Sequence, residues 1–363
     1  MGTRLLAAAV AGACAFPAAA LAQSSVSMSG FFKMAVENVK LDQTTKSPSS
    51  EGRVADEASR IIFQVTEDLG GGLQAVGQLD WRVTLDSGAY AANGNNWVGL
   101  RSKSWGALSL GRFDLHYHNS PSEIAAKGGS YKAQNIALLA FAGGGGTAIA
   151  GNTRTANVVR YDSPNWNGLA VTAAYSMNPA AAEADIGSAV RRGRAWNLVP
   201  SYTAANWQLG WSNWNSKPDA FLTADQKGDR LWGYYVWAGL KLGMAWDRAK
   251  FITGATGAVT SNRTAWSVPL RYTAGRHNFY AEYSKARDDK ATAAADGARM
   301  FALAYAYDLS KRTSVGVTYA RVSNDAGAIY NLYNSAAGQG SASAAVAAGE
   351  DPRIWSVALR HAF

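Results

Sequence analysis

Cysteine is nearly absent from this chain, since Cys14 is the only one among its 363 residues. One thiol cannot form an intramolecular disulfide, and Cys14 lies in an N-terminal segment with the features of a cleaved leader. A lipoprotein anchor at Cys14 is disfavoured, because the preceding Ala11-Gly12-Ala13 lacks the usual leucine. The scarcity of thiols excludes a disulfide scaffold, a thiolate nucleophile and a cysteine-based metal site in the mature protein.

Charged residues are also scarce. They make up 17% of the chain, against about 25% in a typical soluble domain, which indicates a surface that water does not wet completely. The mean hydropathy is nevertheless only −0.15, and after the leader there is no uncharged apolar run of the roughly 18 residues that a transmembrane helix needs. The sequence therefore excludes a bundle of membrane helices, and any membrane span has to be built from strands.

The start of the chain has the organisation of a Sec signal peptide. Arg4 supplies a positive charge, an apolar run follows from Leu5 to Ala19, and Ala20-Leu21-Ala22 forms an A-x-A cleavage site. We expect residues 1–22 to be removed on export and residues 23–363 to form a single transmembrane domain.

The chain is basic, with a formal net charge of +9 at pH 7. A basic protein can bind nucleic acid or an anionic surface. Here, however, the lysines and arginines are spread over many alternating segments rather than gathered in one run. That dispersal favours a basic lumen that attracts anions, and no nucleic-acid partner is expected.

From residue 23 onward the dominant period is two, repeated in segments of about ten residues, the length of a tilted membrane-spanning strand. The first segment sets an apolar face against a polar one: Val26, Met28, Phe32, Met34 and Val36 against Ser27, Ser29, Lys33 and Glu37. Another sets Leu73, Ala75, Leu79, Trp81, Val83 and Leu85 against Gln74, Gln78, Asp80, Arg82, Thr84 and Asp86. The polar face is too charged for a sandwich interior, so the pattern indicates apolar side chains outside and polar ones inside.

Counting these segments predicts an all-β fold, a transmembrane antiparallel up-and-down β-barrel of about 16 strands, with the even number usual in bacterial barrels. The expected strands lie near residues 26–39, 59–67, 73–86, 96–102, 107–113, 156–163, 169–177, 194–203, 207–215, 230–237, 240–248, 263–272, 277–286, 299–307, 313–321 and 353–363. Short connections alternate with long ones, the latter at about 40–58, 178–193, 249–262, 287–298 and 322–352. Such alternation is typical of outer-membrane barrels.

Aromatic residues concentrate near the expected strand ends, which suits the two girdles where such rings meet the lipid headgroups. They include Trp97, Trp105, Trp166, Trp207, Trp211, Trp214, Trp232, Trp237, Trp266 and Trp355, with Tyr161, Tyr175, Tyr272 and Tyr319.

Short motifs occur along the chain in a defined order: Ser25–Gly30, Ser59-Arg60, Thr66–Leu73, Trp97–Leu100, Leu108–Arg112, Val159–Pro164, Tyr307–Thr313 and Leu359–Phe363. Their order and spacing resemble the trimeric general (non-specific) porins of Gram-negative proteobacteria, over nearly the whole mature chain. The resemblance implies an outer-membrane channel filled with water, through which small hydrophilic solutes and ions diffuse passively. It also implies a homotrimer in contact with outer-membrane lipid and lipopolysaccharide. Passive diffusion needs no cofactor and no metal.

The end of the chain also follows period two, since Trp355, Val357, Leu359, His361 and Phe363 share one face. A final strand of this kind resembles the signal that the barrel-assembly machinery reads in the porin family. The resemblance therefore implies that Phe363 marks the chain for assembly.

The connection at about residues 114–155 follows the fifth expected strand and is the longest in the first half of the chain. The resemblance implies that it folds inward and narrows the channel, where charge and diameter select solutes. Its candidate residues are Asp114, His116, His118, Glu123, Lys127 and Lys132. The segment is rich in His, Ala and Gly, and it departs from the short acidic motif common in the family.

A basic wall is expected to face this loop. Arg60, Arg82 and Arg160 are candidates by period-two parity, and Arg112 joins them by resemblance only. Opposite charges across a narrow aqueous pore set a transverse field that orients polar solutes. Each arginine could instead be a solvated lumen residue without a role in selectivity.

Catalytic motifs are not evident in the sequence. The histidines His116, His118, His277 and His361 have no Gly-x-Ser-x-Gly elbow beside them, and the His-x-His pair has no evident third metal ligand. Gly143–Gly146 lacks the following Lys-Ser/Thr of a P-loop. The chain is therefore expected to be a channel and not an enzyme. A substrate-selective organic-anion or phosphate channel remains the main alternative, followed by an outer-membrane barrel enzyme and a plugged structural barrel.

Overall fold

The computed structural model describes residues 24–116, 129–134, 136–139, 141–142, 147–148, 154–179, 193–217, 225–253, 256–333 and 346–363. These residues are mostly in β-strands, accompanied by the short helix α2 (Ile136–Leu139). No helix in the described ranges is long and apolar enough to cross a membrane. The expected signal peptide at 1–22 lies outside the described residues.

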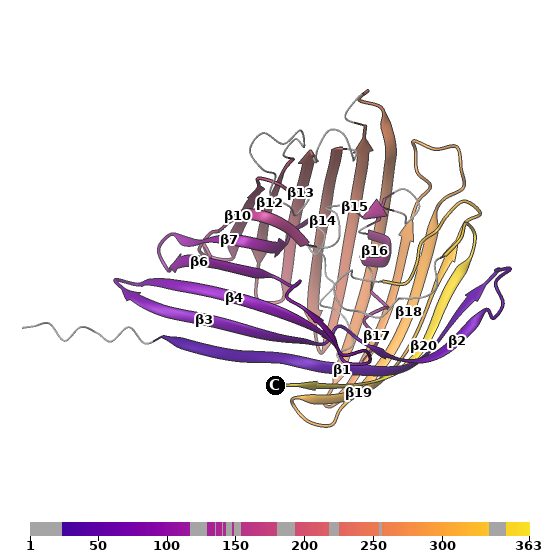
Figure 1. Ribbon diagram of the computed structural model, residues 1–363, viewed down its shortest axis with the longest axis horizontal. Coiled ribbons are helices and arrows are strands. Elements are labelled where there is room, and N and C mark those ends of the chain that lie inside the picture. Colours follow the sequence, from indigo (N-terminus) through magenta and orange to yellow (C-terminus); the bar gives the residue numbers. More distant parts are fainter. Residues whose placement is uncertain are drawn as a thin grey trace, which may run out of the picture.

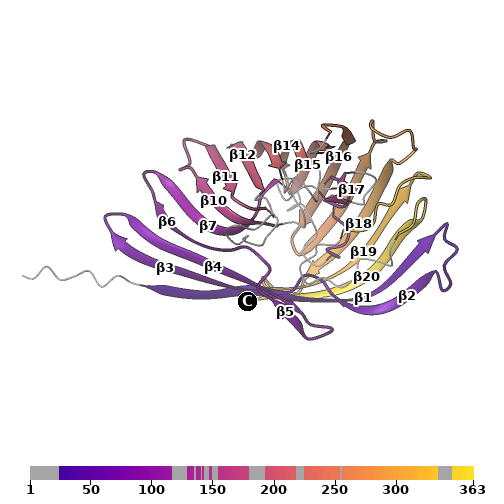
Figure 2. The same ribbon diagram turned by 45° about the horizontal axis from the view of Figure 1, so that its top comes forward.

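Sixteen strands form one closed antiparallel ring, as the sequence predicts. In Figures 1 and 2 the later strands stand side by side as a curved wall, and β1, β3 and β4 run obliquely past its base. In ring order the strands are β1 (Ser25–Asp42), β3 (Arg60–Gly70), β4 (Leu73–Thr84), β6 (Asn96–Ser102), β7 (Gly106–Asp114), β10 (Arg154–Asp162), β11 (Leu169–Ser176), β12 (Arg194–Thr203), β13 (Trp207–Lys217), β14 (Asp225–Trp237), β15 (Leu240–Ile252), β16 (Val259–Ala274), β17 (His277–Ala286), β18 (Ala298–Asp308), β19 (Thr313–Asn324) and β20 (Asp351–Ala362).

The ring closes where the two ends of the chain meet. Strands β1 and β20 pair from Phe31 opposite Ala362 to Asp42 opposite Asp351. Beyond this ladder the backbones of Gly30 and Phe363 exchange two hydrogen bonds of 3.1 Å. Every ring strand therefore has a hydrogen-bonded neighbour on both sides, which is what a membrane-spanning sheet needs.

Side chains alternate between the two faces of the wall, and the alternation is inverted relative to a soluble protein. On β15, Met244 and Trp246 are 57% and 41% exposed, whereas Ala245 and Asp247, which alternate with them, are fully buried. The outer face is thus apolar and the charged residues point into the interior of the ring, called the lumen below. This is the arrangement expected where the outside is lipid and the inside is water.

Tight turns join the strands at the end of the barrel where Gly30 and Phe363 meet. Strands β14 and β15 are connected by Ala238 and Gly239, whose φ angles are both positive, at 46° and 82°. Positive φ at both central residues is the geometry of a type I′ hairpin turn, whose twist matches that of the strands.

One expected long loop is partly strand. Residues 40–58 were expected to be a single long connection, but β1 runs on to Asp42 and β2 (Ser50–Asp56) pairs with Met34–Lys40 of β1. Strand β3 pairs with Ser25–Phe31 on the same edge of β1. Together β2 and β3 therefore form the second strand of the barrel wall. The polar composition of Ser50–Asp56 is typical of a loop and does not predict a strand. Its charge is accommodated because Arg53 points inward and pairs with Glu37.

Three short strands lie outside the ring order. Strand β5 (Ala89–Ala91) pairs with the end of β4. Strands β8 (Phe141–Ala142) and β9 (Thr147–Ala148) form a small separate hairpin between β7 and β10.

Candidate functional site

The connection after β7, the fifth strand of the ring, reaches the opposite wall in its described parts. Helix α2 contacts β16, β17 and β18. We call residues 115–153, which join β7 to β10, the inner segment.

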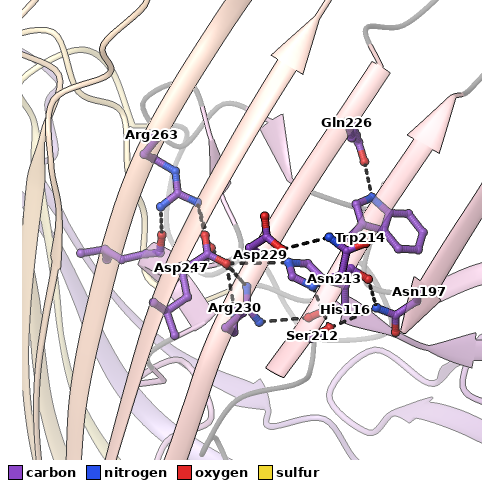
Figure 3. A network of polar contacts seen from close by, with 12 residues as sticks. His116, Asn197, Ser212, Asn213, Trp214, Gln226, Asp229, Arg230, Asp247 and Arg263 are labelled. Atoms are coloured by element: carbon purple, nitrogen blue, oxygen red, sulfur yellow. Dashed lines mark hydrogen bonds and ion pairs between the residues drawn. The ribbon is translucent and has the colours of Figure 1, made fainter. Parts of the chain in front are cut away.

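The first attachment of the inner segment lies on β14–β16 and is drawn in Figure 3. Arg230 donates from Nε to Asp247 Oδ2 at 2.9 Å, and Arg263 donates to Asp247 Oδ1 at 3.4 Å. Arg263 also donates to the carbonyl oxygens of Leu138 and Leu139, both at 2.8 Å. One wall carboxylate therefore holds two arginines, and Arg263 in turn holds the end of α2.

His116 belongs to this attachment. Its Nδ1 lies 2.8 Å from Ser212 Oγ and its Nε2 lies 3.8 Å from Asp247 Oδ2, while its carbonyl oxygen accepts a hydrogen bond of 3.0 Å from Arg230. Burial lowers the pKa of His116 below its ordinary 6.5, outweighing the attraction of the nearby Asp247 carboxylate. The ring is therefore neutral at pH 7 and packs against the wall rather than standing free in the water-filled space.

The second attachment lies on the other side of the lumen. Lys132 Nζ lies 3.0 Å from Glu37 Oε2 and 3.1 Å from Glu57 Oε1. Ser130 donates to Glu57 at 2.7 Å, and its backbone N–H donates to Thr318 Oγ1 at 2.7 Å. The inner segment is thus bonded to β1, to the residues before β3, and to β19.

The charge of Lys132 is secured by its two carboxylates. Burial alone would lower the pKa of Lys132, but the attraction of Glu57 and Glu37 outweighs it and raises the pKa above its ordinary value. Lys132 is therefore neutralised in place and offers no free positive charge to a passing solute.

Arg60 and Arg82 lie directly opposite each other on β3 and β4, with both side chains on the inward face. Arg82 pairs with Asp80 at 2.8 Å. Arg60 donates from Nε to the Ala58 carbonyl at 3.2 Å, and within the described part of the chain it has no carboxylate partner. Arg60 therefore keeps an uncompensated positive charge beside a second arginine.

Arg160 is compensated more fully. It makes two hydrogen bonds of 2.8 Å with Asp162, and its guanidinium lies 5.3 Å from the centre of the Phe113 ring. A bidentate pair of this kind is rigid and locally neutral.

The structure does not bring Arg112 together with the other three arginines. By alternation along β7 it falls on the face of Leu108 and Leu110, and it lines a cavity of about 680 Å³ with Leu110 and Met177. Asp114 contacts Arg154 at 3.2 Å. His118, Glu123 and Lys127 lie outside the described residues.

Period-two patterning does not single out several residues of the site: Glu37, Glu57, Arg230, Asp247 and Arg263. The period-two alternation of the sequence predicts only that the side chains of Asp247 and Arg263 point inward. Nothing in the sequence shows that the inner segment reaches them, because those contacts join residues more than a hundred positions apart.

Comparisons with known proteins agree with this architecture. A family model described as Gram-negative porin matches residues 7–327. The chain is 26% identical to an outer membrane porin protein of Bordetella pertussis, over 86% of this chain and 92% of the relative. It is 27% identical to outer membrane porin protein 32 of Delftia acidovorans, over 95% and 96%. Among solved structures, an anion-selective porin from Comamonas acidovorans superposes with a TM-score of 0.78 at 21% identity, covering 94% of this chain and 100% of that one. The chain belongs to the Gram-negative porin family, and it forms a channel across the outer membrane.

Proposed function

We propose that the lumen passes small hydrophilic solutes and ions by passive diffusion and favours anions. The observation that carries the preference is the uncompensated charge of Arg60 opposite Arg82. Fixed cations along an aqueous path raise the local concentration of anions. The anion selectivity of the solved Comamonas acidovorans porin supports the same preference.

The driving force in this proposal is the solute gradient alone, so the channel uses no cofactor and catalyses no reaction. Water and hydrated ions meet the polar inward side chains, while the apolar outer face meets lipid. The family membership points to a channel rather than an enzyme.

We propose that the inner segment narrows this path. Its described parts are anchored both at Asp247 and at the Glu37–Glu57 pair, so it spans the lumen rather than lying along one wall. Its candidate residues Glu123 and Lys127 would add charge to the narrow part, and the basic wall of Arg60, Arg82 and Arg160 would face them.

The test is the reversal potential of the purified protein in a planar bilayer under a KCl gradient. The wild type is expected to favour chloride. Arg60→Gln is expected to shift the potential towards zero more than Arg82→Gln, because Asp80 already offsets the charge of Arg82. A cation-favouring potential in the wild type would contradict the anion preference, and the absence of conductance would contradict the channel.

A channel selective for organic anions or phosphate is the second candidate. It is favoured by the uncompensated Arg60, because a guanidinium binds planar oxyanions through two hydrogen bonds. Currents carried by acetate or phosphate in place of chloride separate the two candidates.

We propose a homotrimer built on the outer face of β1–β7. The exposed side chains on that face are mostly aliphatic, among them Val26, Met28, Val36, Val98, Leu108 and Leu110. The exposed aromatic side chains concentrate on later strands, as in Trp196, Tyr202, Trp207, Trp237, Trp246, Tyr283, Phe301 and Trp355. Aromatic girdles mark the lipid boundary, so the aliphatic face suits a neighbouring subunit. Conductance steps in threes would support the trimer.

We propose that outward basic residues contact phosphate groups of lipopolysaccharide. On β17 and β18, Lys285 and Arg299 lie directly opposite each other, each two residues from an exposed ring, Tyr283 or Phe301. Both are exposed and neither has an ion pair in the described part of the chain. Facing like charges destabilise a sheet, and an anionic headgroup between them would relieve the repulsion.

We propose that residues 1–22 are a cleaved signal peptide and that the final strand is the substrate of the barrel-assembly machinery. Phe363 supports the second point, because its ring packs on Phe32 of the first strand at 5.1 Å. Phe363→Ala is expected to lower the amount of folded barrel in the outer membrane, measured on isolated membranes. Unchanged assembly would remove Phe363 from the signal.

A further inference from the structure

Two arginines share one aromatic ring on the inner wall. Phe31 of β1 points into the lumen, and the guanidinium carbons of Arg60 and Arg360 each lie 4.7 Å from the centre of its ring. That distance is within the range of a cation–π contact. The three residues come from β1, β3 and β20, so the closure of the ring assembles them. We call them the arginine clamp.

The clamp concentrates positive charge that the described residues do not neutralise. Arg60 and Arg360 repel each other, and Asp308 attracts Arg360 without forming an ion pair with it. Lys33, the direct cross-strand neighbour of Arg360, is also basic. Holding like charges together is unfavourable unless something anionic offsets them.

The rest of the site offers a hydrogen-bond donor. Ser314 of β19 lies directly opposite Arg360 and is nearly fully buried. Its Oγ has no hydrogen-bond partner among the described residues. A buried hydroxyl left without a partner is uncommon in proteins, and an anion held by Arg360 would supply one.

The clamp lies next to the inner segment. Lys33, two residues along β1 from Phe31, donates from Nζ to the carbonyl oxygen of Gly129. Phe31 is adjacent to Gly30, which bonds Phe363 at the end of the barrel where both chain ends lie. The clamp is therefore nearer to that end of the barrel than the Lys33–Gly129 contact is. A solute that has passed the inner segment therefore meets the clamp next.

We propose that Phe31, Arg60 and Arg360 form a saturable binding site for oxyanions, carboxylate or phosphate groups carried by permeating solutes. The Phe31 ring holds both guanidinium groups in place. Arg60 uses its Nε for the Ala58 carbonyl, and its terminal N–H groups remain to bind an anion. Carboxylates and phosphates accept two such hydrogen bonds side by side, whereas chloride has no matching geometry. The clamp thus adds binding to the general attraction of the basic wall.

The experiment replaces chloride stepwise by acetate, and separately by phosphate, at constant ionic strength, with wild-type protein in a planar bilayer. A bound oxyanion blocks chloride current at a low oxyanion fraction, so the wild-type conductance is expected to fall steeply with the first additions. Arg360→Lys keeps the positive charge but removes the paired N–H donors of the guanidinium. Phe31→Leu keeps much of the side-chain volume but removes the aromatic ring. Each is expected to raise the half-blocking oxyanion concentration about tenfold. The acetate and phosphate arms show which oxyanion the site prefers.

Arg101→Gln is the matched control. Arg101 donates to Gln74 at 2.9 Å and lies at the end of β6, which pairs with β4 and β7 and not with the three strands of the clamp. It is expected to leave the half-blocking concentration unchanged. The inference rests on the proposed anion-favouring channel, and the two can fail separately. A wild type without conductance would contradict the function, whereas normal conductance with equal block in the wild type, Arg360→Lys and Phe31→Leu would overturn the clamp alone.

Discussion

Asp247→Asn tests whether the inner segment depends on one carboxylate. Asp247, Arg230 and Arg263 are fully buried, and the carboxylate is the group that both arginines contact on the wall. The amide keeps the shape and removes the charge, so Arg230 and Arg263 both lose their contact with this carboxylate. Removing one partner of a buried ion pair costs about 3–5 kcal/mol. We expect about 3 kcal/mol here, because the amide oxygen can still accept one hydrogen bond.

The assay is urea unfolding of the protein in lipid vesicles, followed by the fluorescence of its 13 tryptophans. Asp229→Asn is the control. Asp229 lies on the outward face of the neighbouring strand β14 and accepts a hydrogen bond from Asn213 at 2.9 Å. That change is expected to cost less than about 1 kcal/mol. The double variant Asp247→Asn with Arg230→Gln should recover part of the loss, because one of the two buried cations facing the neutral amide is removed. Equal losses for Asp247→Asn and Asp229→Asn would refute the argument.

Three further predictions follow from charged contacts in the connections and at the rim. The raised pKa of Lys132 means that its stabilising contribution is complete below the ordinary lysine value of 10.5 and is lost as pH rises through the higher folded value. Lys132→Met should therefore remove the fall in unfolding free energy that the wild type shows at alkaline pH. The hydrogen bonds of Glu350 with the Ala347 backbone, Lys46 and Thr44 lower its pKa to about 2, so its contribution is present above 4.5 and is lost as pH falls towards 2; Glu350→Gln should flatten the acid limb, measured by thermal unfolding. Lys285→Gln with Arg299→Gln should reduce the lipopolysaccharide that copurifies with the protein, and unchanged retention would argue against a phosphate contact.

Much of the fold is predictable because the membrane imposes two rules at once, a strand length and a strict alternation of faces. The expected strand at 277–286 coincides with β17, and the one at 207–215 differs from β13 by two residues. The rules fail at β2, because Arg53 and Glu51 give that stretch the composition of a loop. There the partner strand, rather than the local sequence, decides the structure.

The site is less predictable, because alternation gives the direction of a side chain but not its partner. Arg60, Arg82 and Arg160 are all inward, yet their charges differ in effect, since Asp80 and Asp162 neutralise the latter two. The clamp is still harder to foresee. It joins Phe31 to Arg360 across the closure of the ring, and no local pattern connects residues from opposite ends of the chain.

The alternation of faces along each strand also decides which changes of chain length this protein can survive. One residue inserted within β15 before Trp246 would reverse the phase of the rest of that strand, turning Asp247 towards lipid and Trp246 towards water. Two inserted residues would restore the phase, and a connection such as 325–350 could absorb any number. In evolutionary terms, insertions and deletions in this chain should accumulate in the connections and should come in even numbers wherever they fall inside the wall.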